Sequence, residues 1–464
     1  MNAKIIASFA IGPIGAAVLG FITLPIITWF FSAEDIGRIS MLQVVSSFSV
    51  LLFCLGLDQA YVREYHEAEQ KPALLKAVLM PGFVLLLLVS TVLMLVPGAV
   101  SRLLFDIDSV AISAFVVFCL LFSFISRFLS LVLRMQERGL AYSMSQALPK
   151  VLFLAVIGIY VLFKFGFDFS HLVNAHVISI SAVTLIFAWN TRDELQASLD
   201  QKVNIEKLVA MLKFGLPLIM GGMAFWGLTA MDKLFLRSLS SFEELGVYSV
   251  AVSFAAAAII FQQIFSTVWA PTVYKWAAEG VSPEKIDQVT EHVLAAVVFT
   301  FALAGLFSWV VSYLLPDTYG RVQYILVTCM AYPLLYTLSE TTAVGIGLTR
   351  KSLYAMVASI VAAVVNLIGN YLLIPAYGAA GAAISTAIAF WVFLLLRTEF
   401  SCRVWRPLPR KKLYSTTLVS LVAAIAFTLV GEEHRWIFVV FWVSMILVWS
   451  FVFRRSLISI RLLF

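Results

Sequence analysis

Long apolar runs separated by short polar segments dominate the pattern of this 464-residue chain. A helix that crosses a bilayer needs about 20 consecutive, mostly apolar residues. We therefore predict that each run of about this length is a membrane-spanning helix. The fourteen predicted spans are 5–31, 36–56, 73–97, 109–133, 140–163, 172–191, 214–237, 245–270, 289–315, 322–347, 352–374, 380–400, 412–430 and 436–453.

The composition supports this prediction. Hydrophobic residues make up 62% of the chain and charged residues only 12%, whereas soluble domains contain roughly 25% charged residues. A soluble fold of this length cannot hide so much apolar surface, and the runs are far longer than β-strands. We therefore predict an all-α polytopic membrane protein. The composition excludes a soluble enzyme, a nucleic-acid-binding protein and a disordered chain.

The distribution of Lys and Arg predicts the orientation of the spans. If the N-terminus is cytoplasmic, 23 of the 32 Lys and Arg residues lie in cytoplasmic segments and six lie in segments on the other side. Short cytoplasmic loops carry such an excess of cations. We expect both termini to be cytoplasmic.

Two similar segments indicate an internal repeat. FSAEDIGRIS at 31–40 is similar to SSFEELGVYS at 240–249, and Arg138 and Arg350 match at an offset of 212 residues. Each repeat contains six predicted spans, so both halves enter the membrane in the same direction. This predicts two six-helix lobes related by a pseudo-two-fold axis along the membrane normal. The expected divisions are an N-terminal lobe at 1–191, a cytoplasmic linker at 192–213, a C-terminal lobe at 214–400 and an added helical hairpin at 412–453.

The repeated segment has a structural interpretation. Ser32 with Asp35, and Ser241 with Glu244, have the spacing of a capping box at the start of a helix. We therefore interpret this element as part of the architecture rather than of the chemistry.

Several motifs resemble a known superfamily of transporters. They are LKFGLPLI at 212–219, AMDKLFLRS at 230–238, GIGLTRKS at 345–352 and YLLIPAYGAAGAAISTAIA at 371–389, together with Asn366-x-x-x-Asn370. Over roughly residues 1–400 the chain is similar to the multidrug/oligosaccharidyl-lipid/polysaccharide exporter superfamily, and within it to the polysaccharide transporters that include O-antigen flippases.

The resemblance implies a bilobed transporter with a central cavity in the bacterial inner membrane. Such transporters move undecaprenyl-diphosphate-linked oligosaccharide to the outer leaflet for the synthesis of O-antigen, a part of lipopolysaccharide, or of exopolysaccharide. The expected partners are the lipid-linked oligosaccharide, membrane lipids, a polysaccharide polymerase and chain-length proteins. No nucleic acid and no cofactor are expected.

Polar side chains inside the spans are the candidate functional residues. A charge at the bilayer centre costs about 2.5–3.5 kcal/mol on insertion scales, so such residues are retained for a reason. Cations would face the headgroup of a lipid diphosphate, and amides would contact sugars. The candidate cavity residues are Lys150, Arg127, Lys233, Gln262, Asn366 and Asn370. The candidates for gating or coupling are Asp58, Arg63, Asp232 and Glu340.

Each candidate also has a structural interpretation that stays open. Arg127 lies close enough to the inner end of its span to snorkel toward the headgroups. Asp232 and Lys233 are adjacent and suit an interfacial pair. Lys150 lies deeper, about ten residues into its span, so snorkelling explains it less well.

The remaining candidates have similar alternatives. Glu340 suits a pair with a cation on a neighbouring helix or a place in the inner water layer. Asn366 and Asn370 share one helix face and suit polar contacts between helices. Asp58 and Arg63 suit a solvated helix end with local pairing.

No catalytic or metal-binding motif is present. The sequence contains no HExxH, GxSxG or Walker motif, and its five His and four Cys are scattered. Transport would therefore use an ion gradient or the membrane potential, with Asp58, Asp232 or Glu340 carrying coupled protons. The alternatives are a flippase for a peptidoglycan or teichuronic precursor, a drug or cation exporter of the same superfamily, and a membrane polymerase or glycosyltransferase.

Overall fold

The computed structural model describes residues 3–454, 456 and 458. These residues form helices joined by short turns, with no β-strand in the described ranges, which confirms the predicted all-α class. Contacts divide the chain into an N-terminal unit, Met1–Ala230, and a C-terminal unit, Met231–Phe464. This division falls inside a helix, and the domain limits at 191 and 214 stay a prediction.

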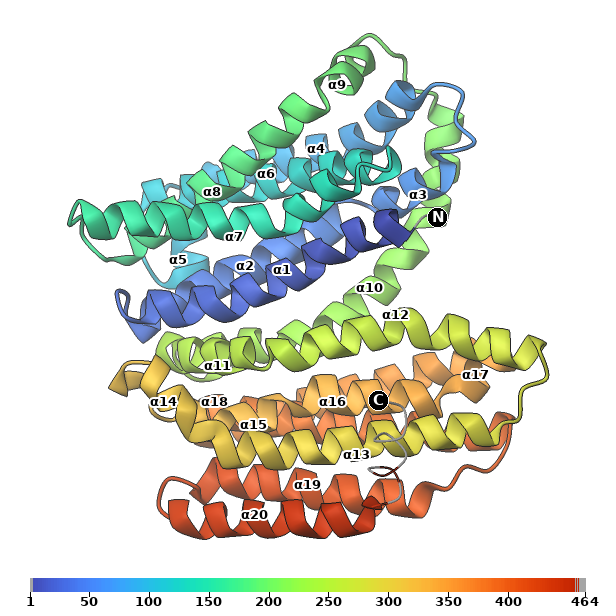
Figure 1. The fold of residues 1–464 in the computed structure, drawn as a ribbon. Helices are drawn as coiled ribbons and strands as arrows, with labels where there is room; N and C mark the ends of the chain where they lie inside the picture. The colour runs from blue at the N-terminus through green and yellow to red at the C-terminus, as the bar shows by residue number, and fades with distance from the viewer. Residues whose placement is uncertain (1–2, 455, 457, 459–464) are drawn as a thin grey trace. The chain divides into compact units, whose positions relative to one another are not determined.

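The N-terminal unit is built on six long apolar helices, with short helices at their ends (Figure 1). Close approach of α1 to α7 depends on glycine: a Cβ on Gly12 would lie 2.5 Å from the Ser143 Cα. The helices are α1 (Ala3–Thr28), α2 (Ala33–Phe53), α3 (Leu57–Glu64), α4 (Lys71–Met94), α5 (Ala99–Phe105), α6 (Val110–Met135), α7 (Gly139–Leu162), α8 (Phe169–Asn190), α9 (Arg192–Leu199) and the first part of α10 (Ile205–Leu239), whose residues from Met231 onward belong to the C-terminal unit.

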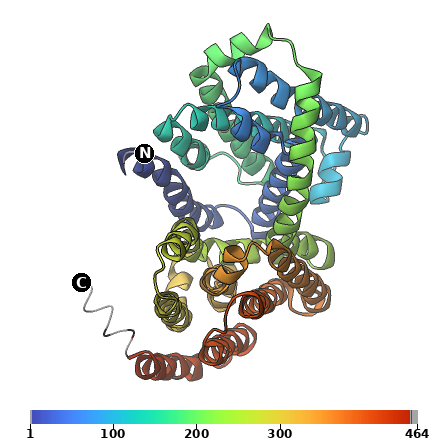
Figure 2. The same ribbon diagram turned by 90° about the vertical axis from the view of Figure 1, so that its right-hand side faces the viewer.

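The C-terminal unit contains a second set of long helices and ends in a hairpin, α19–α20, that packs against α13 and α15 (Figures 1 and 2). Its helices are α11 (Phe242–Phe254), α12 (Ala256–Ala278), α13 (Glu284–Phe307), α14 (Val311–Leu314), α15 (Val322–Cys329), α16 (Ala331–Thr342), α17 (Val344–Leu348), α18 (Ser352–Val404), α19 (Arg410–Val430) and α20 (Arg435–Val452), with 3-10 turns at Ser308–Val310 and Asp317–Tyr319.

Ten helices of the described chain are long and apolar enough to cross a membrane, and up to twelve if each bent pair counts as one span. The bent pairs are the two halves of α10, at 50°, and α11 with α12, at 53°. The sequence-based count of fourteen also includes α1, which contributes only the shorter apolar helix Gly15–Thr28, and treats α18 as two spans.

The 53 residues of α18 contain a break at Gly378. At about 1.5 Å per residue a straight helix of this length would be far longer than the bilayer core is thick. Gly378 has φ 53° and ψ −126°, and a Cβ there would lie 2.3 Å from the Glu244 carboxylate. Glu244 also accepts a hydrogen bond from the Ala379 N–H at 2.7 Å. Glycine therefore lets the chain turn where the sequence predicts the gap between 374 and 380.

The repeated segment caps a helix in each unit, as predicted. The Ser32 hydroxyl accepts a hydrogen bond from the Asp35 N–H at 3.1 Å, at the start of α2. The Ser241 hydroxyl accepts one from the Glu244 N–H at 3.2 Å, at the start of α11. The same local chemistry thus begins the second long helix of each repeat.

Candidate functional site

An ion pair joins the short helix α3 to the long helix α6 in the N-terminal unit. The Arg127 guanidinium on α6 donates to the Asp58 carboxylate at 2.6 Å, and the Gln59 amide donates to the same oxygen at 3.0 Å. Asp58 is buried, with 8% of its surface exposed. The pair places a cation inside the bundle with its charge balanced.

A tight turn positions Asp58. Leu55 and Gly56 both have left-handed backbones, with φ 53° and 68°, between the end of α2 and the start of α3. A Cβ on Gly56 would lie 2.2 Å from the Gly215 carbonyl oxygen, so only glycine fits there. Asp58 then lies in the first turn of α3, where the helix dipole favours a carboxylate.

Arg127 also lines a cavity of about 480 Å³, here called the Arg127 cavity. Hydroxyl and amide side chains from α6 and α7 line much of it, although the Ser130 and Ser145 hydroxyls already donate to backbone carbonyls of their own helices. The lining residues are Val50, Ser123, Ser126, Arg127, Ser130, Tyr142, Ser145, Gln146, Pro149 and Ile180.

Lys150 lies apart from this cavity, although the sequence suggested a shared role with Arg127. Its ammonium group donates to the Ala16 carbonyl of α1 at 2.5 Å. A Cβ on Gly20 would lie 2.7 Å from the same Nζ. Lys150 therefore ties α7 to the backbone of α1.

A second polar cluster, here called the Asp232 cluster, lies inside the C-terminal unit. Asp232 is 2% exposed, and both Asn366 and Asn370 are fully buried. The two amides donate to the Asp232 carboxylate at 3.1 and 2.7 Å. The Tyr248 and Thr386 hydroxyls each donate to it at 2.5 Å.

The Asp232 cluster joins three sequence candidates and adds two that the sequence analysis missed, Tyr248 and Thr386. Tyr248 lies in the repeated segment, and Thr386 lies in the motif at 371–389. The sequence identifies both motifs but does not indicate the roles of these two residues. Among the described residues, no cation forms an ion pair with Asp232. Lys233 is adjacent to it, but consecutive helix residues do not face each other. The hydrogen bonds to this carboxylate therefore all come from neutral donors, and Lys233 acts on it only as a nearby charge.

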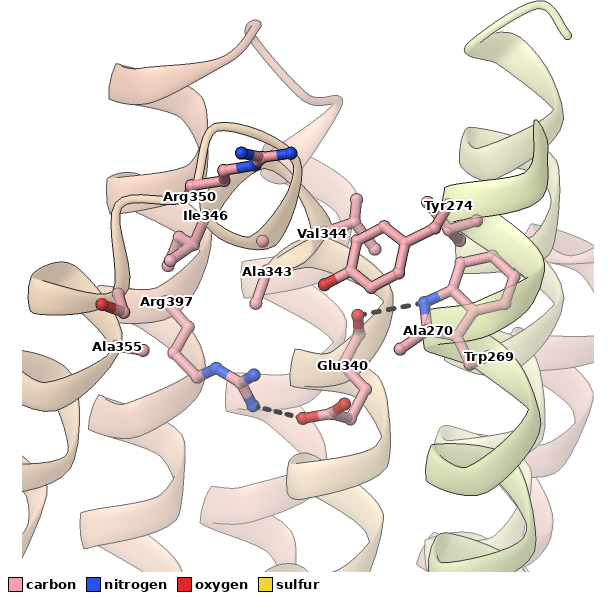
Figure 3. Close-up of a pocket in the computed structure, with 13 residues that line it drawn as sticks. Trp269, Ala270, Tyr274, Glu340, Ala343, Val344, Ile346, Arg350, Ala355 and Arg397 are labelled. Carbon is pink, nitrogen blue, oxygen red and sulfur yellow. Dashed lines mark hydrogen bonds and ion pairs between the residues drawn. The ribbon is translucent and has the colours of Figure 1, made fainter. Parts of the chain in front are cut away.

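Glu340, on α16, forms an ion pair inside the C-terminal unit. Its carboxylate accepts from the Arg397 guanidinium at 2.7 Å, and its backbone carbonyl accepts from the Trp269 indole at 3.1 Å (Figure 3). Arg397 also donates to the Ser339 hydroxyl at 2.8 Å. The sequence suggested a cation on a neighbouring helix for Glu340 but did not identify Arg397.

One member of each of these two ion pairs occupies a matching position in the repeats, whereas the partners do not match. Arg127 and Glu340, which line different cavities, are 213 residues apart. So are Glu137 and Arg350, each left-handed in the turn after its helix, with φ 58° and 57°. The structural register is thus 213 rather than the offset of 212 that paired Arg138 with Arg350. In this register Arg138 matches Lys351, since each occupies the N-cap position of the following helix.

Arg63 and Gln262 are two further candidates that join neither cluster. Arg63 lies 4.5 Å from the Phe214 ring centre and 3.7 Å from the Glu64 carboxylate, so it does not pair with Asp58. Gln262 is half-buried on α12 and lines none of the cavities described here. In the described part of the chain, no three His, Cys, Asp or Glu side chains come close enough to hold a metal ion.

Comparison with known proteins gives the context of these clusters. The sequence matches the family described as polysaccharide biosynthesis protein over residues 3–276, more than half of the chain. It has no significant match among curated proteins.

The fold is similar to that of solved membrane transporters. The lipid II flippase MurJ, in an inward closed conformation, is 15% identical, with a TM-score of 0.68 over 97% of this chain and 99% of that one. An inward-facing multidrug resistance transporter of the MATE family is 16% identical, with a TM-score of 0.59 over 87% of this chain and 96% of that one. At these identities the likeness shows the two-lobed fold alone.

Proposed function

Because the chain belongs to the polysaccharide biosynthesis protein family, we propose that it is a transporter that flips a lipid-linked oligosaccharide across the bacterial inner membrane. The proposed substrate is an undecaprenyl-diphosphate-linked repeat unit for O-antigen or exopolysaccharide. The proposed partners are a polysaccharide polymerase and chain-length proteins that receive the flipped unit.

The observation that carries this proposal is the Arg127 cavity. A diphosphate cannot cross hydrocarbon without partners, because a bare buried charge is extremely costly. Arg127 supplies a guanidinium, whose fork-like geometry matches phosphate oxygens. The Ser126 hydroxyl and the Gln146 side-chain amide line the same space and can supply further donors.

Asp58 supplies the counter-charge when the Arg127 cavity is empty. A partly buried cation left without a partner is destabilising, and the 2.6 Å contact with Asp58 prevents this. An arriving phosphate group replaces the carboxylate as the partner of Arg127. Departure of the substrate lets the ion pair form again, so the cation is never left unpaired.

The first test replaces Arg127 in cells that depend on this protein for surface polysaccharide. We expect Arg127→Ala to reduce polysaccharide export by about 10- to 100-fold, the loss expected for one charge-assisted contact. Arg127→Lys should retain part of the export, because it keeps the charge but not the paired donors. Polysaccharide is measured against protein level in the membrane.

Arg102→Ala serves as the matched control, because Arg102 is exposed and pairs only with the exposed Asp108. It should export normally. Normal export by Arg127→Ala at an unchanged protein level would remove this residue from the mechanism.

A second experiment tests whether the transported substrate is the lipid-linked repeat unit. A strain lacking the protein should accumulate the lipid-linked repeat unit and lose its surface polysaccharide. A flippase for a peptidoglycan precursor is the second candidate, favoured by the match to the lipid II flippase over 97% of this chain. Rescue of cells depleted of their lipid II flippase would support that candidate over the first.

We also propose that Asp232 carries the coupled proton. Asp58 and Glu340 each pair with an arginine, whereas Asp232 is surrounded by neutral donors. Protonation of Asp232 would therefore leave no arginine without its counter-charge. In proteoliposomes, a proton gradient should accelerate transport by the wild type but not by Asp232→Asn.

Asp106→Asn is a control for the general effect of losing a carboxylate, since Asp106 ends the short helix α5, outside the long spans. Its response to the gradient should equal that of the wild type. Transport that requires Na⁺ and ignores the proton gradient would assign the Asp232 cluster to a metal cation instead.

A further inference from the structure

A second cavity, in the C-terminal unit, has a cationic wall that the proposed transport path does not use. It measures about 470 Å³ and is here called the Arg350 cavity. It is formed by α12, by α16 and α17, and by both halves of α18 (Figure 3). The lining residues used below are Tyr274, Glu340, Gly347, Arg350, Ser352 and Arg397.

The charges around the Arg350 cavity sum to one excess cation. Arg397 is neutralised by Glu340 at 2.7 Å. Arg350 is exposed, and its guanidinium makes no hydrogen bond or ion pair with any described residue. Figure 3 shows Arg350 above the Arg397–Glu340 pair, with the cavity between them. An anion entering this space therefore meets an unpaired guanidinium.

The turn itself does not require arginine at this position. Arg350 has a left-handed backbone, with φ 57°, between α17 and α18. The matching position of the N-terminal unit makes the same turn with Glu137, at φ 58°. Because side chains of opposite charge both allow this turn, the charge of Arg350 is not explained by the local backbone.

The wall also supplies neutral donors. A Cβ on Gly347 would lie 2.3 Å from the Tyr274 hydroxyl, so glycine leaves room for that hydroxyl at the cavity wall. No described residue accepts a hydrogen bond from it. Ser352 adds a second hydroxyl in the first turn of α18. The long helix α18 begins here, and helix N-terminal N–H groups favour anions.

We propose that the Arg350 cavity binds a phosphate or diphosphate group. Arg350, the Tyr274 hydroxyl and the Ser352 hydroxyl form its donor set, and Arg397 contributes when Glu340 releases it. The volume lies within the range of small-molecule sites, about 300–1,000 Å³. This inference rests on the proposed function in one respect, since the lipid carrier of that substrate is one source of the group. Free phosphate or pyrophosphate is the other source.

The experiment measures binding of inorganic pyrophosphate to the purified full-length protein in dodecyl maltoside micelles by calorimetry. All variants carry Arg127→Ala, which removes the cation of the N-terminal cavity. Loss of the proposed transport function therefore does not affect the result. Arg350→Gln should weaken binding about tenfold, the effect of losing roughly 1.4 kcal/mol. Tyr274→Phe should also weaken it while keeping the ring in place.

Lys351→Gln is the matched control, because it removes the same charge one residue away from a side chain that does not line the cavity. It should bind pyrophosphate like its parent. Glu340→Gln should bind more tightly, because Arg397 then lacks its carboxylate. Damage to the fold cannot produce tighter binding, so this variant separates the site from a structural effect.

A competition experiment in the same micelles shows whether the bound phosphate or diphosphate group comes from the lipid carrier or from a free compound. Displacement of pyrophosphate by undecaprenyl diphosphate, but not by undecaprenol, would assign the cavity to the lipid headgroup. Lack of displacement by either would assign it to free phosphate compounds. Two results would overturn the proposal: no pyrophosphate binding in the Arg127→Ala background, or equal weakening by Arg350→Gln and Lys351→Gln.

Discussion

At the scale of the residue, the three candidate carboxylates inside this protein are stabilised in two ways. Asp58 with Arg127, and Glu340 with Arg397, balance their charges across helices. Asp232 is held by hydroxyl and amide donors without a cation. Buried charges need such partners. The first arrangement suits exchange of a carboxylate for an anionic substrate, and the second suits a change of protonation.

The Asp58–Arg127 pair gives a prediction that separates stability from transport. Asp58→Arg should lower the melting temperature, because it places two cations together. Adding Arg127→Asp restores an ion pair with reversed polarity and should recover most of the roughly 1–2 kcal/mol lost, a value discounted because Arg127 is partly exposed.

Transport should stay low in the doubly substituted protein. The guanidinium then belongs to α3, away from the hydroxyl groups of the Arg127 cavity. The melting temperature in detergent and surface polysaccharide in cells are the two measurements. Full transport by the charge-swapped protein would show that only the pairing matters and not the position of the cation.

At the scale of the element, glycines determine which helices come close together. Gly12 and Gly20 allow α7 to pack closely against α1. Gly305 allows Trp442 of the terminal hairpin to pack closely against α13. Small residues at helix contacts are typical of membrane proteins, because packing replaces the hydrophobic effect between helices in lipid. The Trp442 ring therefore packs into the space at Gly305 and holds the hairpin against α13.

This docking predicts a steric effect at Gly305. A Cβ there would lie 2.2 Å from the Trp442 ring, and Trp442 is fully buried. Gly305→Ala should destabilise the protein by about 1–3 kcal/mol through overpacking. Thermal unfolding in detergent measures the change, and Trp442→Leu added to it should recover part of the loss.

Gly158→Ala is the comparison variant, because nothing lies within 4 Å of a Cβ at that position of α7. It should leave the melting temperature unchanged or raise it slightly, since alanine favours helix over glycine. Equal destabilisation by both substitutions would mean that contact with Trp442 does not explain the effect at Gly305.

At the scale of the whole molecule, two repeats of similar architecture carry different chemistry. Ser32 and Ser241 cap corresponding helices, whereas corresponding positions within the bundles hold Arg127 in one unit and Glu340 in the other. The repeat has therefore preserved the helix starts while the charges diverged. Such divergence is expected of a transporter in which the two units have different tasks.

The orientation of the molecule in the membrane is a prediction of the Lys and Arg distribution. A green fluorescent protein fused after residue 464 should fluoresce, and alkaline phosphatase fused at the same place should be inactive, because both indicate a cytoplasmic end. Phosphatase fused within the outer segment near Lys164 should be active. An active phosphatase at the C-terminus would reverse the proposed topology.

The sequence predicted the elements better than the contacts between them. The helices, the caps at Ser32 and Ser241 and the gap before residue 380 follow from residues close together in the chain. The break in α18 is local too, because Gly378 marks it. The repeat register was one residue off, since Arg350 and Arg138 have the same charge but occupy different positions in their turns.

The amino-acid sequence by itself therefore determined a helical membrane protein with a repeat, because apolar run length and capping are local properties. Only the tertiary structure decided which polar groups meet. Asp58 contacts a residue 69 positions away, and Asp232 contacts Asn370 138 positions away. Such pairs depend on how each helix is rotated about its axis and where it packs, and apolar spans of similar composition do not encode that choice locally.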